Sequence, residues 1–434
     1  MRLKIHSGTQ EIGGSCVEVW TDNTRILIDI GMPLVEKDGS EFDFKRYQKL
    51  TPEKLIKKGI LPSIDGIYAD SKNLIDGVLI SHPHIDHYGF SNYLHPEIRY
   101  YLGEATHKII ELTGIFTPQK NNIGNPTYFK KSTPCKIGDI TFTPFWMDHS
   151  AFDSYAFLIE SNGKSIFYSG DFRNHGRKHK VFKWFLHNAP VNVDCLLLEG
   201  TRIGRKNKKD KSESEIEKDL IDIFSKNDGI NLIYASGQNI DRLVSIYRAS
   251  KRAGKIFVVD VYTATVLKSL SAFAKLPYPS KNFDDIKVVF PFFLCKRLTR
   301  ENNEKIMFQF RHYKITKEEI DSNKKKIVMT VRPSMKFDLG HIKNIDGGNL
   351  IYSLWEGYLQ RDYTANFMDY LKNRRFNIFK IHASGHAAIG SLNKMADVIK
   401  PKCIIPIHTF KGFEYKNHFN YPVLEVQDGE EVEI

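Results

Sequence analysis

The stretch Ser81-His82-Pro83-His84-Ile85-Asp86-His87-Tyr88-Gly89 gathers three imidazoles and a carboxylate within a few residues. It follows Gly77-Val78-Leu79-Ile80, a short apolar run that predicts a buried strand. The His and Asp side chains are therefore expected in the turn where a strand ends. Zinc and similar divalent ions prefer such nitrogen and carboxylate ligands. The alternative is a polar turn that happens to be rich in histidine, and the density of ligand-type residues favours a metal site.

The same pattern recurs along the chain, because several metal-competent side chains follow short apolar runs. In layered α/β folds, the loops beyond one end of the strands build the functional site. A single case is more often a structural turn residue, whereas several together favour one convergent pocket. The residues in this pattern are Asp29 after 25–28, His82 after 77–80, His149 beyond 140–145, Asp171 after 165–168, Glu199 after 195–198 and His408 after 403–407.

Length and charge restrict the classes of protein that the chain can belong to. With 434 residues, it exceeds one ordinary hydrophobic core, so we expect at least two domains. The formal net charge of +12 favours a polyanionic partner such as nucleic acid, because clustered Lys and Arg displace condensed counterions. A solvated basic surface without such a partner is the alternative.

The cysteines and the N-terminus predict a cytoplasmic protein. The five cysteines are widely spaced and form no C-x-x-C motif, which is typical of free thiols in a reducing compartment. Residues 1–6 alternate like a strand and lack the apolar region of a signal peptide. No apolar run is long enough to span a membrane, so no membrane partner is expected.

A basic, apolar-poor segment at 202–211 marks the boundary of a second domain. Ser212 and Glu215 then have the spacing of a capping box, which predicts the start of a helix. Strand-like and helix-like segments alternate after it, as expected of a parallel α/β sheet. We therefore predict domains at 1–204 and 205–372, with a return to the first domain at 373–434 that carries His386 and His408.

Together, these motifs resemble the metallo-β-lactamase superfamily and, within it, the β-CASP branch of nucleic-acid-cutting enzymes. Asp29 matches the first motif, the stretch at 82–87 the second, His149 the third and Asp171 the fourth. The β-CASP branch adds an acidic residue, a His in a Ser-Gly-His context and a late Pro-x-His. Their matches are Glu199, His386 and His408. The stretches 168–173 and 382–387 are similar to RNase J ribonucleases.

The resemblance implies a fold and a set of ligands. The fold would be α/β, an αββα metallo-β-lactamase sandwich with an inserted α/β β-CASP domain. Two divalent ions would bind, with zinc favoured and manganese as the alternative. One ion would take His82, His84 and His149, and the other Asp86, His87 and His408, with Asp171 between them. Asp29 and Glu199 would orient ligating imidazoles.

The implied activity is metal-dependent hydrolysis of RNA phosphodiester bonds by a hydroxide held between two ions, as in RNase J, with exonucleolytic or endonucleolytic action left open. Asp86, Asp171, Glu199 and His386 would carry the reaction. Ser384, Arg202 and Arg205 would contact the single-stranded substrate together with His386. A DNA substrate, a hydrolase of small esters or lactones, and a non-catalytic nucleic-acid-binding subunit are the alternatives, and a homodimer is left open.

The chain also departs from the RNase J pattern. It ends 26 residues after His408, where full-length RNase J enzymes continue into a further domain that supports oligomers. The segment 235–242 matches the family's Ser-rich turn only in part, and Trp355-Glu356-Gly357 stands where a different phosphate-contacting loop is expected. These departures concern substrate choice rather than the metal site.

Overall fold

The computed structural model describes residues 1–36, 40–70, 72–118, 120–121, 123–205 and 210–434. Two compact units form: the first comprises 1–209 together with Gly385–Ile434, and the second comprises Asp210–Ser384. The second unit is thus inserted between two parts of the first. The basic residues Lys206, Lys208 and Lys209 of the predicted linker lie outside the described residues.

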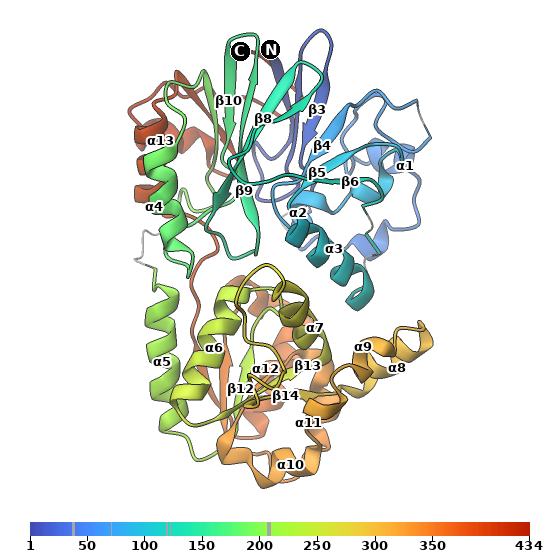
Figure 1. The fold of residues 1–434 in the computed structure, drawn as a ribbon, viewed down its shortest axis with the longest axis vertical. Helices are drawn as coiled ribbons and strands as arrows, with labels where there is room; N and C mark the ends of the chain where they lie inside the picture. Colours follow the sequence, from blue (N-terminus) through green and yellow to red (C-terminus); the bar gives the residue numbers. More distant parts are fainter. Residues whose placement is uncertain (37–39, 71, 119, 122, 206–209) are drawn as a thin grey trace. The chain divides into compact units, whose positions relative to one another are not determined.

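The first unit contains two sheets, which Figure 1 shows facing each other. Among the described residues, the spatial order of the first sheet is β19 (Glu431–Glu433), β1 (Arg2–Ser7), β2 (Cys16–Trp20), β3 (Arg25–Ile28), β4 (Gly77–Leu79), β5 (Tyr100–Leu102) and β6 (Pro126–Tyr128). The order of the second sheet is β18 (Cys403–Ile407), β11 (Cys195–Glu199), β10 (Lys164–Tyr168), β9 (Ser154–Ser161), β8 (Ile140–Met147) and β7 (Cys135–Ile137).

Helices cover the outer faces of the two sheets and complete an αββα sandwich (Figure 1). One layer contains α1 (Pro52–Lys57), α2 (Ile85–Tyr88) and α3 (Glu104–Phe116). The other contains α4 (His179–Asn188) and α13 (Ile389–Ile399). The predicted sandwich is therefore confirmed for the first unit.

Strand β11 shows why the short apolar runs of the sequence mark central strands. All five of its residues are buried. Leu197 packs in the core between the two sheets, whereas Leu196 and Leu198 pack against the layer of α4 and α13. A strand that is covered on both faces needs apolar residues at successive positions, so the sequence shows a continuous run rather than alternation.

The second unit is built on one parallel sheet. Among the described residues, its spatial order is β14 (Ile286–Val289), β13 (Ile256–Asp260), β15 (Ile327–Thr330), β12 (Asn231–Tyr234), β16 (Asn349–Tyr352) and β17 (Asn377–Lys380). The second unit ends later than the predicted boundary at residue 372, because it includes the strand β17, which pairs with β16. The helices of this unit are α5 (Glu213–Ser225), α6 (Ile240–Arg252), α7 (Val261–Leu270), α8 (Phe292–Arg300), α9 (Lys305–Phe308), α10 (Lys317–Ser322), α11 (Lys336–Gly340) and α12 (Asp362–Asn373).

Local sequence signals explain where α5 begins. Ser212 accepts a hydrogen bond from the Glu215 backbone N–H, and the Glu215 side chain accepts one from the Ser212 backbone N–H. The predicted capping box is therefore present, and it satisfies two backbone donors that a helix start leaves unpaired.

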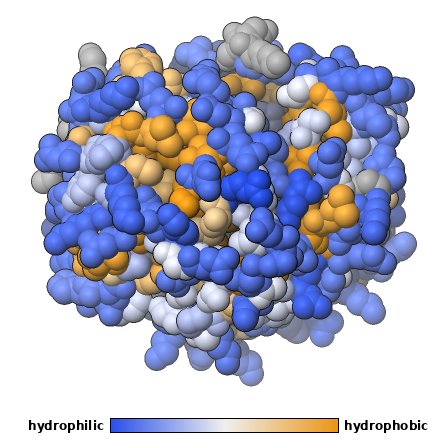
Figure 2. Space-filling model, turned by 90° about the horizontal axis from the view of Figure 1, so that it is seen from above, coloured by the Kyte–Doolittle hydropathy of each residue, from blue (hydrophilic) through white to orange (hydrophobic). Residues whose placement is uncertain are grey.

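The surface and the cysteines agree with the composition. Hydrophilic residues cover most of the face in Figure 2, and hydrophobic residues form separate patches between them. All five cysteines are free thiols. Within the part of the chain that the structure describes, no helix combines the length and the hydropathy needed to cross a bilayer.

Candidate metal centre

The candidate ligands lie in loops that follow strands of the first unit. His82 and His84 lie in the turn after β4, and Asp86 and His87 lie in α2, which that turn opens. The backbone at Gly31 packs closely against the backbone at Asp86. A Cβ atom added at Gly31 would lie only 1.7 Å from the Asp86 carbonyl oxygen, so this position requires glycine. The other candidates follow different strands: His149 follows β8, Asp171 follows β10 and His408 follows β18.

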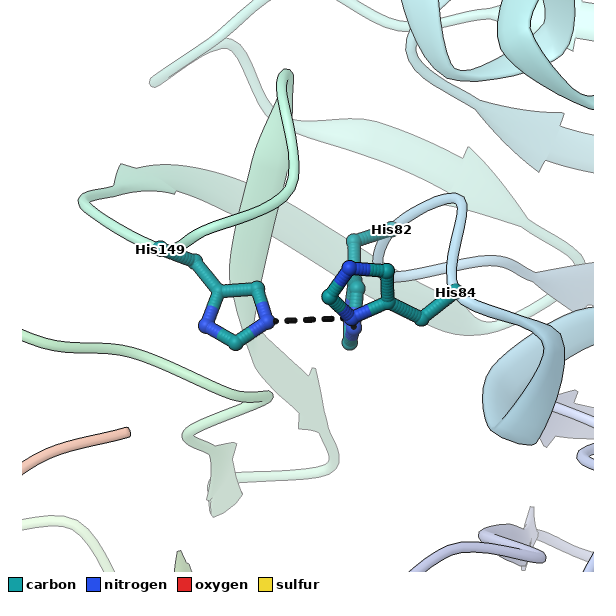
Figure 3. A group of neighbouring side chains, drawn as sticks. All are labelled: His82, His84 and His149. Atoms are coloured by element: carbon teal, nitrogen blue, oxygen red, sulfur yellow. Dashed lines mark hydrogen bonds between the residues drawn. The ribbon is translucent and has the colours of Figure 1, made fainter. Parts of the chain in front are cut away.

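Three histidines form the first group of candidate ligands (Figure 3). His84 Nδ1 lies 3.2 Å from His82 Nε2 and 3.2 Å from His149 Nε2. His82 and His149 are fully buried. The three ring nitrogens thus face one common point, although the residues come from two distant parts of the sequence.

Fixed hydrogen bonds on the outer side of two rings determine which nitrogen faces inward. His149 Nδ1 lies 2.7 Å from the Gly385 carbonyl oxygen, which can only accept, so Nδ1 carries the proton. The Ser81 hydroxyl donates to Asp29 and therefore accepts from His82 Nδ1 at 3.0 Å. The inward Nε2 atoms of both rings then hold lone pairs, which is the state that a metal ligand requires.

Electrostatics also keep these rings neutral. Burial, together with repulsion from the neighbouring imidazoles, holds the pKa of His82 and that of His149 well below the usual range. Burial lowers the pKa of His84 to about 4. In neutral rings, a single proton on His84 Nδ1 has to serve both Nε2 atoms through a bifurcated hydrogen bond, whereas one divalent cation accepts all three lone pairs. The donor set therefore fits a metal ion.

The second group contains Asp86, His87, Asp171 and His408. His408 Nε2 lies 3.3 Å from Asp86 Oδ2, and His87 Nε2 lies 3.3 Å from Asp171 Oδ2. A hydrogen bond from His408 and the charges of nearby imidazoles outweigh burial and lower the pKa of Asp86 to about 2. The group thus combines ionised carboxylates with imidazole nitrogens.

Asp171 lies between the two groups. Its Oδ2 is 3.3 Å from His87 Nε2, 3.7 Å from His82 Nε2 and 4.0 Å from His149 Nε2. Although burial opposes ionisation, the imidazoles of His408 and His87 hold the pKa of its carboxyl well below the usual range. One ionised carboxylate therefore faces both candidate ligand sets.

The buried atoms of this group provide a second test of metal binding. Asp171 is only 2% exposed, yet its carboxylate oxygens and His87 Nε2 have no hydrogen bond of normal geometry with a described residue; the two side chains are related only by the 3.3 Å ion-pair distance. Buried polar atoms are nearly always paired, because an unpaired one costs about 1–3 kcal/mol or more. Carboxylates raise the pKa of His87 well above its usual range despite burial, so positive charge is favoured where a cation would bind.

Asp29 supports the second motif by hydrogen bonds on the side of His87 that faces away from the candidate metal site. Its carboxylate accepts hydrogen bonds from the Ser81 backbone N–H at 2.8 Å, from His87 Nδ1 at 2.7 Å and from the Tyr168 hydroxyl at 2.8 Å. Its backbone adopts a φ of 60°, which is uncommon for a residue other than glycine. This conformation is maintained by the buried bonds and fixes the His87 ring with Nε2 inward.

Glu199 and His386 form a third cluster beside Asp171. His386 Nδ1 lies 3.6 Å from Glu199 Oε1 and 3.7 Å from Asp171 Oδ2. Burial lowers the pKa of His386, but the charges of Asp171 and Glu199 outweigh it and raise that pKa. Glu199 accepts hydrogen bonds from the backbone N–H groups of Thr201 at 2.9 Å and Ala387 at 3.2 Å. The two carboxylates therefore shift this imidazole toward its protonated form.

Several supporting residues could not be identified from the sequence motifs. Ser81 and Tyr168 bind Asp29, and the Thr201 hydroxyl lies 2.8 Å from His408 Nδ1. Arg173 and Asp148 are fully buried, with the Arg173 N–H bonded to the Asp148 carbonyl at 2.6 Å. Only their positions next to predicted ligands could have indicated them, since Asp148 precedes His149 and Thr201 follows Glu199 by two residues.

Glu11 is a further ionisable residue near this centre. Burial, reinforced by the charge of Asp428, raises the pKa of its carboxyl to about 7. It lies in the glycine-containing loop at 8–14, which the sequence did not assign to the site. Its carboxyl thus changes charge near neutral pH.

Of the residues predicted to contact substrate, Arg202, Arg205 and Ser384 are not members of the ligand groups, whereas His386 lies in a group with Glu199 and His408. Arg202 and Arg205 lie in the turn after Glu199. Ser384 is the last residue of the second unit. Lys211, at the end of the predicted basic linker, forms an ion pair with Asp219 of α5. The structure thus brings together the predicted metal ligands, Glu199 and His386, and assigns no such place to these residues.

Comparison with known proteins agrees with this geometry. Residues 67–221 match the family described as "Beta-lactamase superfamily domain". This range includes the second, third and fourth motifs and Glu199. This part of the chain therefore matches the superfamily, and the fold is of the metallo-β-lactamase type.

The chain is also similar to ribonucleases of the RNase J type, at low sequence identity but over more than half of its length. The chain is 24% identical over 422 residues to Ribonuclease J of Helicobacter pylori, covering 92% of this chain and 55% of that protein. It is 25% identical to an RNase J-like protein of Methanocaldococcus jannaschii, covering 60% of this chain and 58% of that protein. The chain thus spans just over half the length of these relatives. The predicted resemblance to RNase J is confirmed.

A solved structure has the same fold over almost the whole chain. It is the crystal structure of a protein of unknown function from Enterococcus faecalis V583. The TM-score is 0.80 at 21% sequence identity, and the similarity covers 99% of each chain. The inserted second unit is therefore part of a fold that both proteins share.

Proposed function

We propose that the protein is a metal-dependent ribonuclease that hydrolyses phosphodiester bonds of single-stranded RNA. The observation that carries this proposal is Asp171, a buried ionised carboxylate without hydrogen bonds from described residues that faces two sets of ligand-type side chains. The similarity to proteins named Ribonuclease J supports RNA as the substrate, and the net charge of +12 agrees with a polyanion.

Two divalent ions would occupy the two ligand sets. His82, His84 and His149 would hold one, and Asp86, His87 and His408 the other, with Asp171 as a ligand of both. The imidazole-rich set favours zinc, and the carboxylates make manganese the alternative. Bound there, the ions would supply Lewis-acid activation of water and neutralise charge on the phosphoryl oxygens.

The protein's own residues would handle orientation and protons. The charges of Asp171 and Glu199 raise the pKa of His386, and its imidazolium form would donate a hydrogen bond to the phosphoryl group or a proton to the leaving oxygen. Glu199 would keep that ring oriented. Asp29 would keep His87 Nε2 directed inward, as its hydrogen bond to His87 Nδ1 supports.

The second unit would act as the β-CASP domain and bind the RNA strand. Arg202, Arg205 and Ser384 would contact phosphates of that strand. The five free thiols support a reducing compartment such as the cytoplasm. A homodimer is compatible with the proposal and is not required by it.

A panel of substrates tests the function. The metal-loaded protein is incubated with 5′-monophosphorylated single-stranded RNA, circular RNA, single-stranded DNA and a small ester, each with and without a chelator. We expect chelator-sensitive cleavage of linear RNA. Cleavage of circular RNA would add endonucleolytic action. Hydrolysis of the ester without cleavage of RNA, or preferential cleavage of DNA, would overturn the proposal.

A further inference from the structure

The second unit contains a cavity that the proposed function does not use. Its volume is about 380 Å³, and residues of α8 and α9 line it. Figure 1 shows these two helices at one end of the unit. Phe292 and Phe308 form apolar walls, and Lys296, Lys314 and Lys317 provide positive charge. Small ligands bind in concave sites of this size with apolar walls and a few polar groups.

Large aromatic rings around this cavity are exposed. Phe292 is 47%, Phe293 54%, Phe308 57% and Phe337 40% exposed. The rings of Phe292, Phe293 and Phe337 contact one another, with centroids 5.2 to 5.4 Å apart. Contiguous exposed apolar groups are uncommon on soluble monomers and mark interaction sites. We call Phe292, Phe308, Phe337, Lys296 and Lys314 the aromatic–lysine surface.

The net charge of this segment is positive. Residues 292–317 contain seven Lys or Arg and two Glu. Among the described residues, Lys296 and Lys314 form no ion pair with a carboxylate, and Lys314 Nζ lies 5.5 Å from the centroid of the Phe290 ring. Unpaired ammonium groups beside aromatic rings suit a ligand that combines negative charge with flat apolar groups.

A buried carboxylate holds the cavity in shape. Asp338 is 2% exposed and accepts a hydrogen bond from the Phe292 backbone N–H at 3.1 Å. Lys317 Nζ lies 3.4 Å from Asp338 Oδ1, and the same ammonium group lies 5.7 Å from the centroid of the Phe337 ring. These contacts fix the start of α8 and thus the position of Phe292. The surface is therefore organised before any ligand binds.

We infer that the aromatic–lysine surface binds single-stranded RNA, with a nucleobase in the cavity stacked on Phe292 or Phe308 and the flanking phosphates near Lys296 and Lys314. A second copy of the chain fits less well, because a symmetric contact would place these cations opposite themselves. A membrane fits less well because Phe292 and Phe308 line a concavity instead of projecting from a flat or convex face. This inference rests on the proposed function, in which the second unit binds RNA, and it assigns the strand a specific place on that unit; binding there does not require cleavage.

Crosslinking locates the RNA directly. Short single-stranded RNA containing 4-thiouridine is photocrosslinked to the full chain carrying Asp171→Ala, which prevents cleavage if the proposed function holds. We expect crosslinked peptides from residues 290–317. The yield should fall in the Phe292→Ala/Phe308→Ala variant and stay unchanged in Phe273→Ala, a control on another exposed phenylalanine of this unit. Crosslinks that avoid 290–317 would overturn the inference.

Affinity measurements separate stacking from charge. The Phe292→Ala/Phe308→Ala variant should bind short single-stranded RNA about 10–100-fold more weakly, at an unchanged salt dependence. The Lys296→Ala/Lys314→Ala variant should reduce the slope of log K against log salt by about 1.4, as expected for two phosphate contacts on a single strand. Melting temperatures check that the variants fold. Unchanged affinity overturns the inference, as does a change only in self-association or in binding to anionic vesicles.

Discussion

The candidate metal centre of the first unit and the proposed aromatic–lysine surface of the second differ in how their residues are supported. At the metal centre, ligand-type side chains are buried, and the rings of His82, His87 and His149 each have a fixed hydrogen bond on the outer side. At the aromatic–lysine surface, rings are about half exposed and lysines have no carboxylate partner among the described residues. Internal hydrogen bonds fix the side chains of the first region, whereas the side chains of the second are exposed and can contact a ligand.

This difference indicates how each region should respond to mutation. A buried centre that shares one carboxylate depends on every member, because a single loss leaves several charges without a partner. An exposed surface distributes its binding over separate contacts, so a single loss has a modest and nearly additive effect. The following predictions test this contrast, beginning with the largest expected effect.

Asp171→Ala should break the metal centre completely. Since Asp171 faces both ligand sets, we expect metal content to fall below two ions per chain and RNA cleavage to fall to background. Metal analysis and single-turnover cleavage measure both effects. Asp22→Ala is the matched control, because the Asp22 side chain is 92% exposed. Full metal content and full activity in Asp171→Ala would contradict the ligand assignment.

His386→Ala should damage catalysis while leaving the metal in place. We expect kcat to fall by about 10²–10³-fold, as for the loss of one group that stabilises charge in the transition state. Metal content and RNA affinity should remain unchanged. The exposed His187→Ala serves as control. Loss of metal would make His386 a ligand instead, and unchanged cleavage would leave it without a role in the reaction.

Glu11→Gln should change the pH dependence of stability. Burial raises the pKa of Glu11 to about 7 in the folded protein from 4.5 in the unfolded chain. The folded state therefore binds more protons between these values, and stability falls as pH rises through this window. Glutamine resembles the protonated form, so the metal-free variant should match the wild type near pH 4.5. Above pH 7 it should be more stable by at most about 3 kcal/mol.

Urea unfolding at several pH values, with a chelator present, measures this effect. If the difference in unfolding free energy between the variant and the wild type is the same at every pH, ionisation of Glu11 does not destabilise the folded protein. The metal-bound protein should show a smaller difference, because a nearby cation favours the ionised carboxylate.

Thr201→Val should have the smallest effect on the metal centre. It removes the hydroxyl that lies 2.8 Å from His408 Nδ1 while preserving the shape of the side chain. Loss of such a supporting hydrogen bond typically lowers metal affinity by about 10–100-fold. A competition titration with a chromophoric chelator measures the affinity. If the affinity is unchanged, the backbone at His408, with a φ of 56°, is sufficient to orient the ring.

The sequence predicted the elements whose signals are local. Apolar runs such as Cys195–Leu198 mark strands that are buried on both faces, and ligand-type residues follow them directly. The capping box at Ser212 depends only on neighbours three residues apart. The site could be anticipated because each motif combines a strand with the side chain at its end.

The remaining features depend on contacts between distant segments. The Gly385 carbonyl that orients His149 lies 236 residues away in sequence. Every residue has a backbone carbonyl, so the sequence does not indicate which one accepts this hydrogen bond. Strands β17 and β19 contain exposed or polar residues, so they lack an apolar pattern and are recognised only by their partners. The exposed phenylalanines of α8 likewise resemble core residues in the sequence.

The pairing of β18 with β11 has a consequence for biosynthesis. These strands lie in register, with Cys195 beside Cys403, yet the whole second unit is translated between them. During elongation on the ribosome, the edge of β11 therefore stays uncovered until β18 has been synthesised. The nascent first unit also lacks the candidate ligand His408 during this time. Binding of metal by the complete ligand set can only follow translation of the last segment, and until then one edge of β11 lacks its partner strand and is open to aggregation or to chaperone binding.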